Sequence, residues 1–206
     1  MLEKLIVIVE ELSMEAALNQ LLPKMLGEIE FQIIRFQCKS ELLKQLPSRL
    51  VGYGNWLPAT SAIIVLLDRD NDDCLLLKHQ LNIMAAQAGL RTKTEAGAGN
   101  SFRVANRIAI EELEAWYFGD WIAVQQAYPR VPLNITERVP YRNSDAILGG
   151  TWEAFERVLK KAGYFKTGLR KLDCARAIFQ KMDVGRNQSQ SFRAFSEAVF
   201  AAKTFI

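Results

Sequence analysis

The feature that most constrains the fold is a run of apolar residues that ends in acids, over residues 63–73. The segment from Ile63 to Leu67 is short, unbroken and rich in β-branched residues, as is typical of a strand buried on both faces of a parallel sheet. Asp68 and Asp70 follow at once, and in an extended chain their side chains point the same way. In open α/β sheets, ligands bind at the carboxyl ends of the strands. Because neighbouring carboxylates repel each other unless a cation lies between them, this pattern predicts a site for a hard divalent cation such as Mg²⁺.

The order of the expected elements predicts an α/β fold. Besides 63–67, strands are expected at 5–9, 30–36 and 102–105, and helices at 13–25 (with Ser13 as its cap), 39–50, 72–88, 108–118, 151–162, 169–182 and 191–203. Residues 51–58 and 96–100 are expected to be loops because they are rich in glycine. Strands that alternate with helices at short spacing predict a Rossmann-like, mostly parallel four-stranded sheet flanked by helices.

The expected domain organisation follows from proline content and charge. Residues 1–127 form the α/β domain, and 128–150, which hold three prolines, form a connecting loop. Residues 151–206 form a helical C-terminal part, expected to pack on the first domain. This part carries 11 Lys and Arg against 5 Asp and Glu, whereas residues 1–150 have a balance of −3. The asymmetry indicates a metal-holding half and a phosphate-facing half. The alternative is an ordinary solvated helical surface.

The cellular compartment is expected to be the cytoplasm. No apolar run approaches the length of a membrane span, and the N-terminus does not have the pattern of a signal peptide. The three cysteines are odd in number and far apart, which indicates reduced thiols and argues against a zinc site.

Three acids are the main candidates for metal ligation and catalysis. Glu10, Asp68 and Asp70 each follow a strand expected to be buried, so their carboxylates converge if those strands are neighbours. The alternative is that the acids cap the following helices, where the helix dipole favours negative charge. Asp72 is a further candidate metal ligand. The capping alternative suits Asp72 and Asp73, which open a helix, better than Glu10, because glutamate is a weak N-cap residue.

A second acidic group lies on the helix expected at 108–118. Glu111 and Glu114 are three residues apart and would share a helix face. They are candidates for further metal ligands, because the aromatic residues at 116–118 make their surroundings apolar. The alternative is a solvated acidic face.

The C-terminal part supplies the candidate nucleic-acid contacts. Lys and Arg side chains there suit the phosphate backbone, and the candidates are Lys160, Lys161, Lys166, Arg170, Lys171, Arg186 and Arg193. The polar segment 186–193 could also offer backbone N–H groups to phosphate. The alternative for this segment is a solvated turn with an N-cap by Ser189 or Ser191.

The glutamate after the first strand and the later Asp68-Arg69-Asp70 resemble the Toprim signature of type IA and II topoisomerases, bacterial-type primases and OLD-family nucleases. The wider chain resembles the Toprim-like domain-of-unknown-function family 4276. That resemblance rests on five blocks, at residues 9–15, 66–74, 110–116, 149–153 and 186–192.

The resemblance implies a Rossmann-like sheet and Mg²⁺- or Mn²⁺-dependent phosphoryl transfer on nucleic acid. Glu10 stands at the position of the Toprim glutamate, a general acid/base or metal ligand, and Asp68 and Asp70 stand at the metal-binding pair. Leu113-Glu114 is similar to a Leu-Glu pair of OLD-type nucleases. Many Toprim proteins have glycine where this chain has Glu11, which changes the local turn. Members of the family are typically bacterial, and the genes of some lie beside those of AAA-type ATPases in defence-like clusters, so the resemblance implies such an ATPase as a partner.

The sequence therefore predicts a metal-dependent nuclease. The rival is a non-catalytic protein of the Toprim fold, an effector or nucleic-acid-binding subunit that acts only through a partner. A phosphatase is a third class, disfavoured because such enzymes usually carry their aspartate pair on the first strand. Whether the target is DNA, RNA or tRNA is left open by the sequence, as is the oligomeric state.

Overall fold

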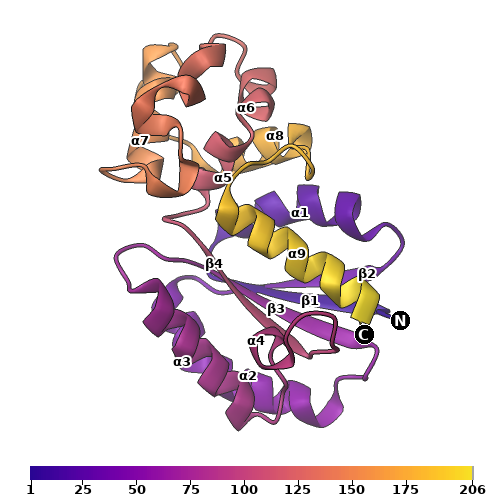
Figure 1. Cartoon of the computed structure of the whole chain (residues 1–206). Helices are drawn as coiled ribbons and strands as arrows, with labels where there is room; N and C mark the ends of the chain where they lie inside the picture. Colours follow the sequence, from indigo (N-terminus) through magenta and orange to yellow (C-terminus); the bar gives the residue numbers. More distant parts are fainter. Residues whose placement is uncertain (206) are drawn as a thin grey trace.

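The computed structural model describes residues 1–205 as one parallel sheet between two layers of helices (Figure 1). The strands are β1 (Lys4–Val9), β2 (Glu30–Arg35), β3 (Ser61–Asp68) and β4 (Val104–Ala109), in the spatial order β2-β1-β3-β4 and all parallel. The helices are α1 (Leu12–Leu26), α2 (Lys39–Trp56), α3 (Cys74–Gln87), α4 (Lys93–Ala96), α5 (Glu114–Gly119), α6 (Trp121–Ala127), α7 (Thr151–Lys161), α8 (Lys171–Lys181) and α9 (Gln190–Phe205). The predicted α/β fold with a mostly parallel four-stranded sheet and a helical C-terminal part is confirmed.

Alternate residues of the strands face two different hydrophobic clusters. In β3, Ile64 and Leu66 face the layer that contains α1 and α9, whereas Ile63, Val65 and Leu67 face α2 and α3. All eight residues of β3 are buried, which is why its sequence is an unbroken apolar run rather than an alternating one.

The second helix is longer than the glycines suggested. Residues 51–56 were expected to be loop, but α2 continues to Trp56. Leu46, Leu50 and Tyr53 recur at helical spacing and are buried, and their packing outweighs the weak helix propensity of glycine. A Cβ at Gly54 would lie 2.7 Å from the carbonyl oxygen of Ala88. Gly54 therefore allows α2 to approach the end of α3 closely.

The boundary between β4 and the next helix was also predicted wrongly. The fourth strand is 104–109 rather than 102–105, and α5 begins at Glu114 rather than at Ile108. The ladder with β3 runs from the pair Ile63 and Val104 to the pair Asp68 and Ala109, so pairing with a buried strand overrides the helical pattern. Glu111 therefore precedes the helix and does not share a helix face with Glu114.

The region between α6 and α7 contains three short 3₁₀ helices, η1 (Leu133–Glu137), η2 (Val139–Tyr141) and η3 (Ser144–Ala146). After it, α8 packs against α1, and α9 packs against β4 and α1. The C-terminal helices thus share one hydrophobic cluster with the sheet.

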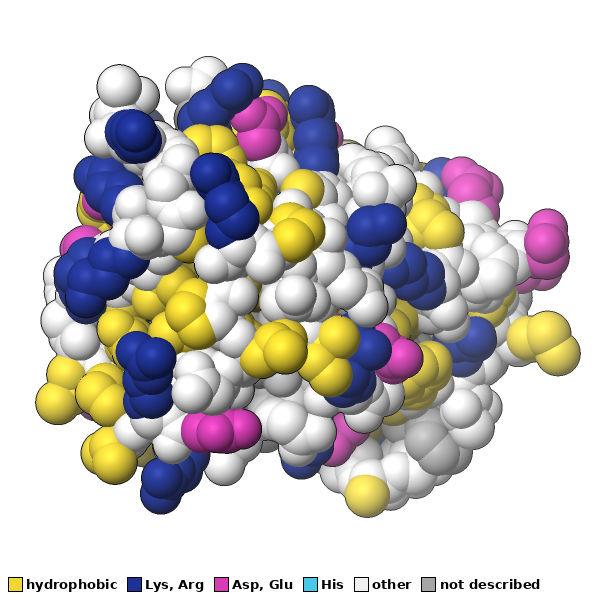
Figure 2. All heavy atoms as spheres, turned by 90° about the horizontal axis from the view of Figure 1, so that it is seen from above, with side chains coloured by type: hydrophobic (Ala, Val, Ile, Leu, Met, Phe, Trp, Pro, Cys, Tyr) yellow, Lys and Arg dark blue, Asp and Glu magenta, His cyan; other side chains and the backbone are white. Residues whose placement is uncertain are grey.

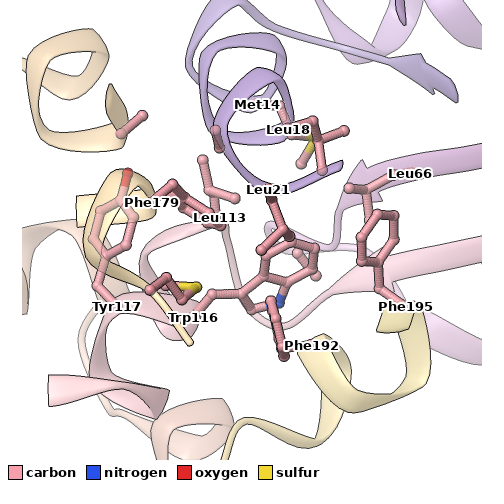
Figure 3. Packing of buried hydrophobic residues seen from close by; sticks show 14 of the residues in the cluster. Met14, Leu18, Leu21, Leu66, Leu113, Trp116, Tyr117, Phe179, Phe192 and Phe195 are labelled. Atoms are coloured by element: carbon pink, nitrogen blue, oxygen red, sulfur yellow. The ribbon is translucent and has the colours of Figure 1, made fainter. Parts of the chain in front are cut away.

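Trp116 is the centre of that shared cluster. Its ring lies 5.1 Å from that of Phe192 and 5.3 Å from that of Phe195, both on α9, with Leu21 of α1 beside it (Figure 3). Its indole N–H donates a 3.0 Å hydrogen bond to Ser191 Oγ. These contacts hold α5 against α9 and so fix the position of Glu114, two residues earlier.

Among the helices of residues 1–205, none combines the length and the apolar character that crossing a bilayer requires.

Candidate functional site

Glu10 and Asp68 lie side by side at the carboxyl edge of the sheet. They follow β1 and end β3, which are neighbouring strands with Val9 paired to Leu66. Glu10 Oε1 accepts a 3.3 Å hydrogen bond from the backbone N–H of Asp68. Both side chains are buried, at 6% and 4% exposure. Parallel pairing therefore brings together two acids that are 58 residues apart.

Glu114, the first residue of α5, is the third buried acid at this edge. It is only 1% exposed, and its charge acts on Asp68. We call Glu10, Asp68 and Glu114 the acid cluster. Within residues 1–205, four of its buried oxygens have no hydrogen-bond partner, namely Glu10 Oε2, Asp68 Oδ1, Glu114 Oε1 and Glu114 Oε2. Because unpaired buried carboxylate oxygens are costly, the cluster suits a bound cation.

The donor set fits Mg²⁺ or Mn²⁺, which prefer carboxylate oxygens and retain water ligands. As they stand, no three His, Cys, Asp or Glu side chains of residues 1–205 converge closely enough to hold one ion. Ion binding would therefore require the acids to draw together.

Two lysines flank the acid cluster: Lys39, which the sequence did not suggest as a site residue, and Lys171, which was predicted as a nucleic-acid contact. The ammonium group of Lys39 lies 2.6 Å from Asp70 Oδ2 and 2.9 Å from Asp72 Oδ2. The ammonium group of Lys171 lies 3.7 Å from Glu114 Oε1 and 5.4 Å from the centre of the Trp152 ring. Lys39 therefore partly neutralises Asp70 and Asp72, and Lys171 lies next to Glu114.

Burial dominates the electrostatics of the acid cluster. Burial raises the pKa of Glu10 to about 7, with Lys39 opposing the shift and Asp70 adding to it. Burial also raises the pKa of Glu114 to about 7, against the attraction of Lys171. Burial, followed by repulsion from Glu10 and Glu114, raises the pKa of Asp68 well above its usual range. The cluster thus resists full ionisation, which is how acids at cation sites behave before the cation binds.

These shifts predict that stability falls as pH rises through the weakly acidic range. Between pH 4.5 and about 7, folded Glu10 and Glu114 retain protons that the unfolded chain has released. The folded state then binds more protons, so the free energy of unfolding decreases with pH, by at most about 3 kcal/mol for each group. Urea unfolding at pH 5 and pH 8 in the presence of a chelator measures this difference.

The matched variants for this experiment are Glu114→Gln, which should reduce the pH dependence, and Glu28→Gln at an exposed site, which should retain it. Equal stability of the wild-type protein at pH 5 and pH 8 would contradict the expectation.

The remaining predicted acids lie at the rim. Asp70 and Asp72 are exposed and pair with Lys39. Asp70 has a left-handed backbone with φ of +50°, a strained conformation that is common at functional sites. Glu111 lies 3.5 Å from the guanidinium of Arg69. These three therefore surround the acid cluster without entering it.

Local contacts also decide the roles of two other residues near the site. Asp73 caps α3 by accepting the N–H groups of Leu75 and Leu76, as expected. Ser13 does not cap α1, which begins after Glu11 and has no side-chain cap there; instead its hydroxyl donates to the Glu11 carboxylate.

The predicted nucleic-acid contacts divide into free and engaged groups. Lys161 and Lys166 are exposed and have no recorded ion pair within residues 1–205, and Lys160 and Arg170 form surface pairs with Glu156 and Asp173. Lys171 turns to the acid cluster. Arg186 is committed to a pair with buried Asp120 at 2.6 Å, and Arg193 donates to the carbonyl oxygen of Asn187 at 3.1 Å. The segment 186–193 is therefore largely a structural turn, in which Ser189 caps the start of α9.

Comparison with known proteins identifies the family. The sequence model of a family described as "Domain of unknown function (DUF4276)" matches residues 9–199. No curated protein and no solved structure matches the chain. The family match spans both the sheet with its acid cluster and the C-terminal helices. The chain therefore belongs to the DUF4276 family.

Proposed function

We propose that this protein is a metal-dependent nuclease of the Toprim type, which hydrolyses nucleic-acid phosphodiesters at the acid cluster. The single observation that carries the proposal is the group of four buried carboxylate oxygens that accept no hydrogen bond from residues 1–205, at the carboxyl edge of a parallel sheet. The order of the acids along the chain, glutamate after β1 and Asp-x-Asp at the end of β3, supports the link to Toprim nucleases.

Glu10, Asp68 and Glu114 would hold Mg²⁺ or Mn²⁺, and Asp70 would join them if Lys39 moved away. A bound ion would supply positive charge that stabilises the reacting phosphate and makes a neighbouring water more acidic. Glu10 would act either as a ligand of the ion or, in its ionised form, as the base that accepts the proton of the attacking water. Lys39 and Lys171 are the nearest cations to offset charge on the phosphate oxygens.

The basic C-terminal helices would hold the nucleic-acid backbone. The end of the molecule that carries α6, α7 and α8 shows many Lys and Arg side chains and few acids (Figure 2). Lys161 and Lys166 are available there, and the surface ion pairs of Lys160 and Arg170 are weak enough to be exchanged for phosphate contacts. An AAA-type ATPase is proposed as a partner on the family resemblance alone.

One observation favours the rival function, a non-catalytic subunit. Lys39 already pairs with Asp70 and Asp72, which lie beside the acid cluster, so its ammonium group could permanently take the place of a metal ion. In that case the fold would act through a partner, without hydrolysis.

The experiment that separates the two functions incubates the purified chain with supercoiled plasmid, single-stranded DNA and RNA. Cleavage is expected with millimolar Mg²⁺ or Mn²⁺ and none is expected with EDTA, because the acids need the ion to act. Ion binding should also raise the melting temperature, by about 5 °C at saturating metal. The nuclease proposal is rejected if neither metal gives cleavage of any substrate or a thermal shift, with and without an ATPase partner. The non-catalytic function would then remain.

A further inference from the structure

The free edge of β4, the outermost strand beside β3, carries a feature that is separate from the acid cluster. A cavity of about 430 Å³ opens there, between the start of α3 and the start of α9, on the two sides of the strand (Figure 1). Its walls include Lys78, Arg107, Ile110, Asn143, Asp145 and Ser191. Since Ile110 directly follows β4, the cavity and the acid cluster share the carboxyl edge of the sheet.

Two cations on its walls lack an anionic partner. Lys78 is half-buried, and within residues 1–205 its ammonium group forms no recorded ion pair or hydrogen bond. Arg107 is also half-buried, and only neutral groups hold it. Its Nε donates to the carbonyl oxygen of Ala194 at 2.8 Å, and its Nη1 to that of Asn106 at 2.7 Å.

The acid of the cavity wall is already engaged. Asp145 accepts the backbone N–H of Ser191 at 2.8 Å and the hydroxyl of Ser189 at 2.7 Å. Glu197 on α9 attracts Arg107 only from a distance, with no ion pair within 4.0 Å among the described residues. Within residues 1–205, the two cations of the cavity wall therefore have no direct ion-pair partner.

Leaving two half-buried cations without an anion is costly. The pKa of Lys78 reflects this cost, since burial and then Arg107 lower it to about 8, with Lys93 of α4 adding slightly and Cys74 opposing. Structural lysines are normally exposed or paired, so an unpaired, half-buried lysine next to an arginine indicates a ligand.

We propose that Lys78 and Arg107 bind a phosphate group of a nucleic-acid strand. The guanidinium N–H groups of Arg107 that its two carbonyl partners leave free, together with a neighbouring ammonium group, suit the several oxygens of a phosphate. A strand is favoured over a free phosphate because Asn143 and Gln190 also line a neighbouring cavity of about 570 Å³. Arg142 also lines that neighbouring cavity, so an extended anion such as a nucleic-acid strand could run through both cavities. The inference rests on the proposed function for the identity of the strand as substrate, but the binding itself needs no hydrolysis.

The test measures binding without turnover. Fluorescence anisotropy of short, labelled single-stranded DNA and RNA is recorded in EDTA over a range of salt concentrations. Lys78→Gln should weaken binding on the order of tenfold, as for the loss of one charge-assisted contact. It should also reduce the slope of log affinity against log salt by about 1. Arg107→Lys, which keeps the charge but loses the guanidinium N–H groups, should weaken binding less.

The matched control is Lys44→Gln, which removes an exposed lysine from α2, away from the cavity, and should change neither affinity nor slope. Circular dichroism and melting temperature verify that each variant is folded. Unchanged oligonucleotide binding by both Lys78→Gln and Arg107→Lys overturns the proposal.

Titration calorimetry with inorganic phosphate distinguishes the two sources of the ligand. Loss of phosphate binding in Lys78→Gln with unchanged oligonucleotide binding would overturn the strand and leave a free phosphate as the ligand. Cleavage assays distinguish this proposal from the previous one. Lys78-dependent binding without any cleavage would refute the nuclease and retain this site, whereas cleavage together with oligonucleotide binding that does not depend on Lys78 or Arg107 would do the reverse.

Discussion

Replacing Asp68 by asparagine is expected to lower the rate of metal-dependent cleavage by about 10³-fold, equivalent to about 4 kcal/mol of transition-state stabilisation. Asp68 is the central acid of the cluster, since Glu10 contacts its backbone and Glu114 acts on its charge. Asparagine keeps the shape of the side chain but has no negative charge to bind a metal ion. The predicted thermal shift with Mg²⁺ or Mn²⁺ should shrink in parallel.

The same substitution is expected to leave the fold intact. Asp68 is buried, and burial raises its pKa, so a neutral side chain at this position relieves repulsion with Glu10. The free energy of unfolding should be unchanged or higher by up to about 2 kcal/mol. Lost activity therefore cannot be ascribed to unfolding, as it could be for a residue whose only role is structural.

Initial cleavage rates and urea unfolding of the same preparations measure both effects. The matched control is Glu137→Gln, an exposed acid on η1, which should retain full activity. Cleavage by Asp68→Asn at the wild-type rate would remove the acid cluster from the mechanism. If neither the wild-type protein nor Asp68→Asn cleaved any substrate, the result would contradict the proposal that the protein is a nuclease.

Replacing Arg186 by methionine is expected to destabilise the protein by about 3 kcal/mol, the lower end of the range for breaking a buried ion pair. Its Nε and Nη2 lie 2.6 and 2.9 Å from the two oxygens of Asp120, whose side chain is fully buried. Without Arg186, the hydrogen-bond partners that residues 1–205 leave to the Asp120 carboxylate would be the N–H groups of Ala123 and Asp183. Arg186 itself is a third exposed, which is why the lower end of the range applies.

Urea unfolding and thermal melting measure this loss, which should lower the melting temperature by roughly 10 °C. The double variant Asp120→Asn/Arg186→Met should recover part of the stability, because it leaves no buried charge unpaired. Arg193→Met removes an exposed arginine from the same segment and should cost less than about 1 kcal/mol. If Arg186→Met lowered the free energy of unfolding by less than about 1 kcal/mol, the ion pair with Asp120 would contribute little to stability.

The sheet was predictable because local hydrophobic patterns in the sequence indicate its strands. The apolar run at 63–67 is buried on both faces, and a run of this length that is rich in β-branched residues is typical of a strand within a parallel sheet. The end of α2 and the start of α5 were mispredicted because packing decided them. At Gly54, the close approach of α3 and not a turn requires glycine. At Val104–Ala109, pairing with β3 overrides a helical pattern that continues into α5.

The candidate site was predictable only in part. The meeting of Glu10 and Asp68 follows from the geometry of parallel strands, whose carboxyl ends share one edge. The positions of Lys39 and Lys171 follow from no local pattern, because each comes from a helix whose placement depends on the whole core. The unpaired state of Lys78 and Arg107 is equally invisible in the sequence, since it depends on which acids the fold leaves nearby.

The sequence by itself determined the α/β class and placed Glu10 and Asp68 at the ends of two strands, because hydrophobic periodicity is a local property. That β1 and β3 are neighbours, so that these two acids meet, was decided by the tertiary structure. Only the tertiary structure decided which acids are buried, which cations accompany them and which cations remain without partners. The physical reason is that burial and charge pairing depend on contacts between residues far apart in the chain, as between Glu114 and Lys171.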